Sequence, residues 1–528
     1  MDQHPENFLH ILDTNAELNG NETIHFRGRL QALDDFVARL LDRRRQYLAL
    51  LSPWRRLPHD LLAEIFIHVV ESIGQYHQWD LQEVLSRLSL VCRRWHDVVL
   101  KTHRLWSTLE IHGPFTPLVS THLETWFKRA GDVPKSLTFS APECPSSNPS
   151  HACFIYNHAL AQFLAQGPSL NHFSMHCANP LCLRYGLQLM KALRKEPAKG
   201  TWSTIKSLQL VFNQEWTERN PLHPERSVFH LLPPITSLDL RLPPLPRRHS
   251  PQNAHLGVDW DEVKSDPSLV LHIPETLLSS LTLLTLHCNW NGALVLSILK
   301  PCKSLQSLEL DFASTTQIFG NPQEIQNLAD NNIILPHLRI LRLRHTKPDT
   351  LDLFHLLLTP SLTELDLDFE RDDNWLIPSS RSWHELLSGP LLGLVERSKC
   401  RVHVERLRLK TLHDVDEDVL QRILLGLPAL THLTTDDVDL YPSLLCKLAF
   451  AEPPALARLQ RLEMYRFKSN ALVGLVKYLG LRKRRKELEG IPFTTTDVLV
   501  KASSGTVLRM SKGVATLTSA DESEDEDD

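Results

Sequence analysis

The stretch Leu305-Gln306-Ser307-Leu308-Glu309-Leu310 alternates apolar and polar side chains from its second leucine onward. Alternation with a period of two is typical of a strand that buries one face. The same Leu-x-x-Leu-x-Leu spacing, with occasional substitutes, starts at nine other positions: Leu170, Ile205, Ile235, Leu281, Leu338, Leu362, Val404, Leu430 and Leu459. A weaker copy lies at residues 136–139. These segments predict a series of short strands.

The repeated segments hold many of the leucines, which make up 98 of the 528 residues. Their central apolar residue recurs at intervals of 24 to 46 residues. The shortest intervals equal those of the leucine-rich repeat, whose unit is a strand followed by a helix or turn. Between strands, residues 417–427 and 471–481 space their apolar side chains three and four apart, which indicates helix. An array of leucine-rich helices is the alternative, and the period-two alternation argues against it.

The chain thus resembles the leucine-rich-repeat family in an irregular form, because the Asn or Cys that usually follows the strand is not regularly placed. The resemblance implies an α/β solenoid shaped like a horseshoe, with a parallel sheet on its concave face. We expect this domain to span residues 130–490. Residues 242–268 are expected to form an insertion, since they contain several prolines and no apolar period.

If the leucines point inward, the residues between them point to the concave face. Acidic and basic strands then alternate, and they supply the candidate target-binding residues: Glu309, Asp311, Arg342, Arg344, Glu364, Asp366, Asp368, Arg406, Arg408 and Lys410. Neighbouring strands lie about 4.8 Å apart, so these charges neutralise one another, form a patterned surface for a protein partner, or do both. Few aromatic residues accompany them, which argues against nucleic acid.

A second informative segment covers residues 53–106. It starts with Leu57-Pro58, and apolar residues at helical spacing follow: Leu61, Leu62, Ile65 and Phe66. Pro58 and Asp60 suit the start of a helix. The stretch Leu88-Ser89-Leu90-Val91-Cys92-Arg93-Arg94-Trp95 contributes a second helical face, and the segment closes with Arg104-Leu105-Trp106.

These residues resemble an F-box, and the order of F-box and repeats is similar to that of fungal F-box/leucine-rich-repeat proteins. Residues 71–83 depart from the pattern, because they make a longer gap between the helices. The resemblance implies binding to a Skp-type adaptor, and through it to a cullin–RING scaffold, by ten residues: Leu57, Pro58, Leu61, Leu62, Ile65, Phe66, Leu88, Val91, Cys92 and Trp95. About fifty residues cannot bury all these apolar side chains alone, so a partner is expected. The alternative is a helical cap on the solenoid.

The expected fold class is therefore an α+β multidomain protein, in which a small all-α F-box domain at residues 53–110 precedes the α/β repeats. Residues 24–52 predict an amphipathic helix, because Phe26, Leu30, Leu33 and Val37 begin a four-three spacing. This helix either packs on the F-box or self-associates. Residues 1–23 and the acidic end at residues 500–528 are expected to be disordered.

Composition disfavours several partners and compartments. The net charge is -5, but residues 521–528 carry seven acidic groups, so the remainder shows no charge excess for nucleic acid. No apolar run approaches the roughly 18 residues of a membrane-spanning helix, and from the residues at the start of the sequence we expect no secretory signal. We expect cytoplasm and/or nucleus. The run Lys483-Arg484-Arg485-Lys486 is either a nuclear localisation signal or the solvated end of a helix.

Chemistry-bearing motifs are sparse. His172, His176, Cys177 and Cys182 suggest zinc, but a strand at this position would point Cys177 away from His176. We expect no metal, no cofactor and no enzymatic activity, since no paired catalytic groups are recognisable. The predicted function is the substrate-recognition subunit of an SCF-type (Skp–cullin–F-box) ubiquitin ligase, in ubiquitin-dependent protein catabolism, with an unknown protein substrate. A protein-binding scaffold without ligase function is the alternative.

Overall fold

The computed structural model describes the following parts of the chain: residues 17–73, 81–141, 154–194, 200–214, 224–243, 271–290, 292–312, 332–371, 382–413, 415–452, 455–467, 470–488, 497–502, 507–511 and 514–518. The chain divides into two compact units, Met1–Leu105 and Trp106–Asp528, which are described separately. Most of the expected insertion at residues 242–268 lies outside the described residues.

The first unit begins with α2 (Gly20–Leu51), a helix of 32 residues. Its start is fixed by a capping box, in which the Glu22 N–H donates to Asn19 Oδ1 (2.9 Å) and the Asn19 N–H donates to Glu22 Oε2 (3.0 Å). Residues 20–23 are therefore helical, and the expectation of disorder across residues 1–23 is wrong for them. No residue of α2 is buried, so the helix does not pack its apolar residues on the F-box.

The rest of this unit is a small helical bundle. It contains η1 (Pro53–Arg56), α3 (His59–Ile73), α4 (Leu81–Val91), α5 (Arg93–Lys101) and the start of η2 (His103–Trp106). Its core consists of buried apolar side chains from all three α-helices and η2: Leu62, Phe66, Ile67, Val84, Leu85, Val98, Val99 and Leu105. An ion pair between Arg104 and Glu71 (2.6 Å) links the last turn to α3. The spacing of apolar residues accounts for these helical segments, but the single helical face expected across residues 88–95 is wrong, because the backbone is extended at Cys92 between α4 and α5.

The second unit contains a sheet of 15 strands among the described residues. In order they are β1 (Thr108–His112), β2 (Ser136–Ala141), β3 (His172–Cys177), β4 (Ser207–Phe212), β5 (Ser237–Arg241), β6 (Leu283–His287), β7 (Ser307–Asp311), β9 (Ile340–Thr346), β11 (Glu364–Phe369), β12 (Arg406–Leu412), β13 (His432–Val438), β14 (Arg461–Phe467), β15 (Asp497–Ala502), β16 (Val507–Ser511) and β17 (Val514–Thr518). Each segment predicted from the leucine spacing is one of these strands.

Strands β1 to β15 are parallel and follow one another in chain order, whereas β15, β16 and β17 pair antiparallel. The sheet is thus mixed and does not close on itself. A separate two-stranded sheet pairs β8 (Ile333–Ile334) with β10 (Leu357–Leu358). A parallel neighbour requires a crossover connection, and the segments between the strands supply it.

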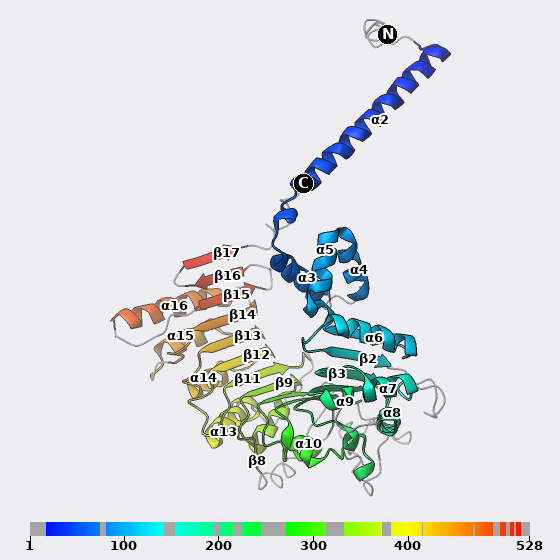
Figure 1. Cartoon of the computed structure of the whole chain (residues 1–528). Coiled ribbons are helices and arrows are strands. Elements are labelled where there is room, and N and C mark those ends of the chain that lie inside the picture. Colours follow the sequence, from blue (N-terminus) through cyan, green and yellow to red (C-terminus); the bar gives the residue numbers. More distant parts are fainter. Residues whose placement is uncertain are drawn as a thin grey trace, which may run out of the picture. The chain divides into compact units, whose positions relative to one another are not determined.

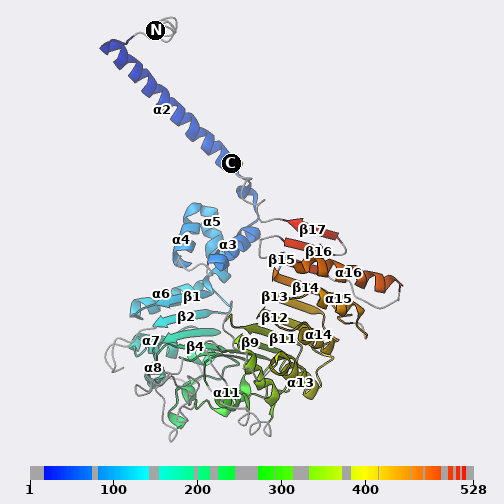
Figure 2. The same cartoon turned by 180° about the vertical axis from the view of Figure 1, so that it is seen from behind.

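Helices line one side of the large sheet, along the outside of its curve (Figures 1 and 2). They are α6 (Pro117–Arg129), α7 (His158–Gln166), α8 (Pro180–Leu193), α9 (Thr201–Thr204), α10 (Glu275–Ser280), α11 (Gly292–Leu299), α13 (Gly389–Arg397), α14 (Glu417–Gly426), α15 (Pro442–Phe450) and α16 (Asn470–Leu488). Shorter turns are η3 (Pro224–Arg226), η4 (Val228–Leu231), η5 (Pro348–Leu356) and η6 (His384–Ser388). Within the described residues, no helix is both long and apolar enough to cross a membrane.

The register of the sheet places equivalent leucines side by side. Leu308 of β7 pairs with Leu341 of β9, which pairs with Leu365 of β11, and the row continues to Leu407 and Leu433. The first four of these side chains are fully buried. A second buried row runs parallel to it, two residues further along each strand. The leucine spacing of the sequence is therefore the core of the unit, between the sheet and its helices.

Four strands also share an irregular backbone position. His345, Thr411, Asp437 and Arg466 occupy the same place in β9, β12, β13 and β14, and each has a positive φ of 45° to 57°. A positive φ is rare for residues with a side chain and here bends the strand so that the next side chain turns inward. Thr346 and Leu412, which follow two of them, are fully buried. The segments that contain β9, β12, β13 and β14 therefore share a backbone feature as well as the spacing of their apolar residues.

The expected domain borders need two corrections. β1 pairs with β2, so the sheet starts at Thr108 rather than near residue 130. At the other end, β15, β16 and β17 continue it to Thr518, so described residues between 500 and 518 are strands and not a disordered tail. Residues 519–528, with most of the acidic groups, lie outside the described part of the chain.

Candidate functional site

The F-box bundle has large apolar side chains on its surface as well as in its core. Leu61 of α3 and Leu90 and Val91 at the end of α4 are 53%, 82% and 59% exposed. We refer to these three side chains as the F-box apolar surface. Exposed leucines are common singly, but several large exposed apolar side chains on one small domain are typical of a protein-binding surface.

Arg94 holds the two parts of this surface at one end of the bundle. Its guanidinium donates through Nη1 to the backbone carbonyl of Arg55 and through Nη2 to that of Leu57. Arg94 comes directly after Val91, Cys92 and Arg93, and Leu57 lies two residues before the start of α3. The clamp therefore fixes the start of α3 beside the junction of α4 and α5. A planar guanidinium suits this task, because it offers donors in a rigid fork.

The structure divides the ten predicted adaptor-binding residues into three groups. Pro58, Leu61, Val91 and Cys92 are exposed, and Leu57, Ile65, Leu88 and Trp95 are half-buried. Leu62 and Phe66 have exposed fractions of only 0% and 1% and build the core, so in this structure they support the domain rather than its surface. Helical spacing gives a broad apolar face without showing which part the domain itself covers.

Leu90 is the residue that the sequence prediction omitted. Among the described residues of the bundle it is the most exposed large apolar side chain, and it lies on the last turn of α4 next to Val91. A signal was present, because Leu88-Ser89-Leu90-Val91 holds one more apolar residue than a single buried helix face requires.

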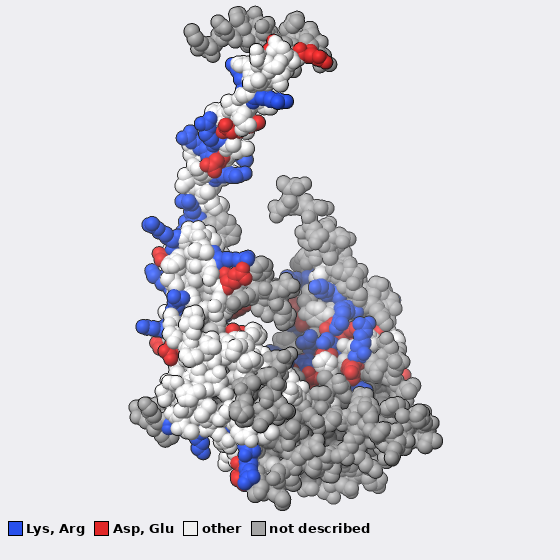
Figure 3. All heavy atoms as spheres, turned by 90° about the vertical axis from the view of Figure 1, so that its right-hand side faces the viewer, with Lys and Arg blue, Asp and Glu red and all other residues white. Residues whose placement is uncertain are grey.

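On the large sheet, the predicted target-binding residues lie on four neighbouring strands, β7, β9, β11 and β12. The register sets Glu309 opposite Arg342 and Asp311 opposite Arg344, as the sequence predicts. Figure 3 shows acidic and basic side chains mixed on a hollowed face. We call the ten residues the charged sheet face.

Most carboxylates of this face are bound by its own cations. Arg344 contacts Asp366 Oδ2 through Nη2 (2.9 Å) and Glu309 Oε1 through Nε (3.3 Å). Arg342 contacts Glu364 (3.0 Å), and Lys410 contacts Asp368 (2.7 Å). Burial alone lowers the pKa of Arg344, but hydrogen bonds and charges of Asp366 and Glu309 outweigh it, and the pKa is raised.

Two of the predicted target-binding residues are therefore hidden. Asp366 and Asp368 are only 4% and 6% exposed, because the arginine and lysine side chains of neighbouring strands fold over them. Arg406 and Arg408 of β12 remain exposed. Arg406 reaches Glu364 at 3.6 Å, and Arg408 has no ion-pair partner within 4 Å among the described residues. The exposed part of the charged sheet face is therefore richer in basic side chains than the ten residues taken together.

The other sequence motifs occupy structural positions. His172 Nδ1 lies 2.9 Å from Ser207 Oγ, and Cys177 and Cys182 are buried. Within the described residues no group of three or more His, Cys, Asp or Glu side chains is arranged for a metal ion. In the basic run of α16, Arg485 is buried and donates to the carbonyl of Ala449 (2.6 Å), so only Lys483, Arg484 and Lys486 are exposed.

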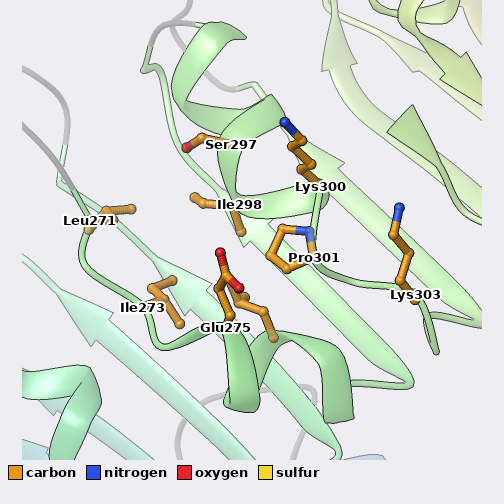
Figure 4. Close-up of a pocket in the computed structure, with 9 residues that line it drawn as sticks. Leu271, Ile273, Glu275, Ser297, Ile298, Lys300, Pro301 and Lys303 are labelled. Carbon is orange, nitrogen blue, oxygen red and sulfur yellow. The ribbon is translucent and has the colours of Figure 1, made fainter. Parts of the chain in front are cut away.

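A pocket of about 410 Å³ lies between α10 and α11, lined by Leu271, Ile273, Glu275, Leu278, Ser297, Ile298, Lys300, Pro301 and Lys303 (Figure 4). The Ser297 hydroxyl donates to the carbonyl of Leu294 (2.7 Å), within its own helix. The lining pairs no nucleophile with a base, so the pocket gives no basis for assigning a reaction to it.

A comparison with curated proteins finds no match for the chain. Residues 54–112, by contrast, match the F-box-like domain family. The matched region contains α3, α4 and α5, with the Arg94 clamp and the F-box apolar surface. Sequence pattern, helical bundle and family match agree over the same residues, and they identify the chain as a protein with an F-box-like domain.

Proposed function

We propose that this protein is the substrate-recognition subunit of an SCF-type ubiquitin ligase. In this proposal the F-box apolar surface binds a Skp-type adaptor, and the large sheet binds the protein to be ubiquitinated. The observation that carries it is the exposure of Leu61, Leu90 and Val91 on a domain that matches the F-box-like family. A helix of the adaptor would cover these side chains and remove them from water.

We propose further that the second unit is a leucine-rich-repeat solenoid. Support comes from the unbroken chain order of its parallel strands, the rows of equivalent buried leucines and the shared positive-φ position of four strands. A solenoid offers one long face to a partner. The exposed cations Arg406 and Arg408 favour a target segment with acidic side chains or phosphate groups.

The chain would make and break no bonds in this role. It would act by proximity, holding the target near a ubiquitin-conjugating enzyme recruited to the same cullin–RING scaffold. Residues that matter for function are then contact residues, and their loss lowers complex formation rather than a chemical step.

The adaptor interface is tested by copurification of the adaptor with the full chain. We expect Leu61→Ala with Val91→Ala to lose the adaptor while the chain stays folded, because both side chains are already exposed. Leu118→Ala with Val476→Ala is the matched control, since these side chains are 68% and 59% exposed outside the F-box helices. Retention of the adaptor by the Leu61/Val91 variant contradicts the proposed interface.

The target face is tested by affinity purification with the proteasome inhibited. Arg406→Ala with Arg408→Ala should lose captured target proteins and keep the adaptor. Arg422→Ala with Lys477→Ala, two exposed cations on α14 and α16, should keep both. A chain that binds target proteins but never an adaptor would instead be a scaffold without ligase function.

A further inference from the structure

We infer that α2 is a dimerisation element, in which two copies of this chain form a parallel, in-register coiled coil. The inference is independent of the proposed ligase role, because it concerns a helix outside the F-box-like region. The first supporting observation is the exposure of the helix. Although α2 has 32 residues and many large apolar side chains, none of its residues is buried.

The apolar side chains of α2 follow a heptad. Its d positions are Phe26, Leu33, Leu40 and Tyr47, and its a positions are Leu30, Val37, Arg44 and Leu51. Apart from Phe26 and Arg44, these side chains are between 44% and 74% exposed. Positions a and d form a single stripe along the helix, and in coiled coils that stripe packs against the same stripe of a partner helix.

The charged residues at positions e and g, which flank the a and d stripe, favour a second copy of this chain as the partner. In a parallel pair, each g residue faces the e residue five positions further along the other helix. Arg29 (g) then faces Asp34 (e) of the second copy, and Glu22 (g) faces Arg27 (e) of the second copy. Both contacts pair opposite charges, and symmetry repeats each of them. Glu22 uses Oε2 in its own helix cap, which leaves Oε1 for the arginine.

The apolar g and e residues continue the same agreement. Phe36 (g) faces Leu41 (e) of the second copy, and these side chains are 51% and 48% exposed in the single chain. Arg43 (g) with Leu48 (e) is the one unmatched pair of the four within α2. The antiparallel alternative lacks such matches. With full overlap it places Arg29 opposite Leu50 and Asp34 opposite Leu41, so no charge is neutralised. The sequence of α2 is thus complementary to itself in the parallel direction.

Arg44 is the charged exception at an a position. A polar residue at a lowers the stability of a coiled coil but penalises other registers and partners more, so it specifies the in-register pair. A lipid surface is the competing occupant, since α2 carries six arginines against four acidic residues, and the vesicle arm of the first test decides between the two.

The first test is the mass of the full chain in solution, measured by light scattering across a dilution series. The wild type should have twice the chain mass of 60.4 kDa. Leu33→Ala with Leu40→Ala should be monomeric at the same concentrations, since alanine preserves the helix and removes the stripe. Gln31→Ala with Gln46→Ala, away from the stripe, should remain dimeric. A monomeric wild type overturns the inference, and flotation of that monomer with phosphatidylserine vesicles would assign the stripe to lipid.

The second test addresses the direction of the pair. Arg29→Glu places a carboxylate against Asp34 of the second copy and should weaken dimerisation several-fold, whereas Arg29→Glu with Asp34→Arg should restore it. A double variant as weak as the single one refutes the parallel register. All α2 variants should copurify with the adaptor as the wild type does, so loss of dimerisation and loss of adaptor binding are separate results.

Discussion

Phe66 of α3 and Trp95 of α5 pack edge to face in the F-box bundle, with their ring centroids 4.8 Å apart and their planes at 60°. Phe66 is fully buried and Trp95 half-buried, so the pair joins the core to the edge of the bundle. The two residues belong to helices that are separated in the sequence by α4, and this contact fixes how those helices meet.

Replacing Phe66 by Ala should lower the free energy of unfolding of the bundle by about 3–5 kcal/mol, the usual cost of emptying a buried aromatic site. Trp95→Ala should cost less, because its ring is partly exposed. The double variant should show a coupling of roughly 1 kcal/mol from the edge-to-face contact. Hydrogen exchange of α3 and α5 in the full chain measures these values, and strictly additive losses would rule out a direct interaction.

Arg94→Lys should loosen the start of α3. Lysine keeps the charge but cannot donate in a fork to the carbonyls of both Arg55 and Leu57, so a loss of about 1–2 kcal/mol is expected. Adaptor affinity should fall as well, because Leu57, two residues before α3, loses the hydrogen bond that fixes its backbone to Arg94 of α5. The neighbouring Arg93→Lys is the control, since Arg93 is exposed. Equal effects of the two changes would show that the clamp is unimportant.

The contrast between Leu61 and Leu62 shows what the sequence could predict here. The local pattern identified the helical segments, the Leu-Pro start and the family resemblance. It did not show that the second helical segment is broken at Cys92 into α4 and α5. It could not tell that Leu62 is buried and Leu61 exposed, because that depends on the angle at which α5 crosses α3. Leu90 was missed for the same reason.

On the large sheet, Leu308, Leu341 and Leu365 show the opposite case. Their period-two spacing predicts both the strands and the inward direction, so the register followed directly from the sequence. Strand β1 was missed although Trp106-x-x-Leu109-x-Ile111 has the spacing with apolar substitutes, because these residues overlap the end of the F-box segment. Strands β15, β16 and β17 were missed because they lack leucines at that spacing and join the sheet by pairing with its last strand. The burial of Asp366 could not be predicted from residue spacing either, because it depends on the side chain of Arg344, which extends from the neighbouring strand to bind it.

Arg344→Ala should destabilise the second unit more than loss of a surface ion pair does. Asp366 is 4% exposed and would lose its closest cation, at a cost of about 2–4 kcal/mol. Arg344→Ala with Asp366→Ala should recover part of this loss, because no buried charge remains unpaired. Arg406→Ala, at a side chain 60% exposed, should cost under about 1 kcal/mol. Chemical unfolding measures all three, and a neutral Arg344→Ala contradicts the expected burial cost.

The pH dependence of Arg344 has a definite sign. Its folded pKa is raised, so the pair contributes fully at every pH below the unfolded pKa, which is itself strongly alkaline, and is lost only as the pH rises through the folded pKa. The stability difference between wild type and Arg344→Ala should therefore stay constant from slightly acidic to slightly alkaline pH. A difference that changes near neutral pH would mean that another group supplies the pairing.

His172 should make the second unit less stable in mild acid. Burial lowers its pKa from 6.5, against the opposing effect of Asp239. Stability is then complete above pH 6.5 and decreases as the pH falls from there toward the folded pKa, because the unfolded chain binds the proton first. His172→Asn keeps a hydrogen-bonding group near Ser207 and should flatten part of this slope. An unchanged slope in unfolding measurements between about pH 5 and 7 would exclude His172 as a contributor.

Cys92 should report adaptor binding by its reactivity. It is exposed between Val91 and Arg93, next to the F-box apolar surface, so a bound adaptor would cover it. Burial raises the pKa of Cys288 and Cys302 to about 12 and that of Cys400 to about 11, so these thiols should alkylate slowly with or without the adaptor. In mass spectrometry after timed alkylation, these three buried cysteines therefore serve as the internal reference for the labelling of Cys92. Protection of Cys92 alone on adding the adaptor places the interface at the junction of α4 and α5. Unchanged labelling of Cys92 in a complex that still forms would place the interface elsewhere on the bundle.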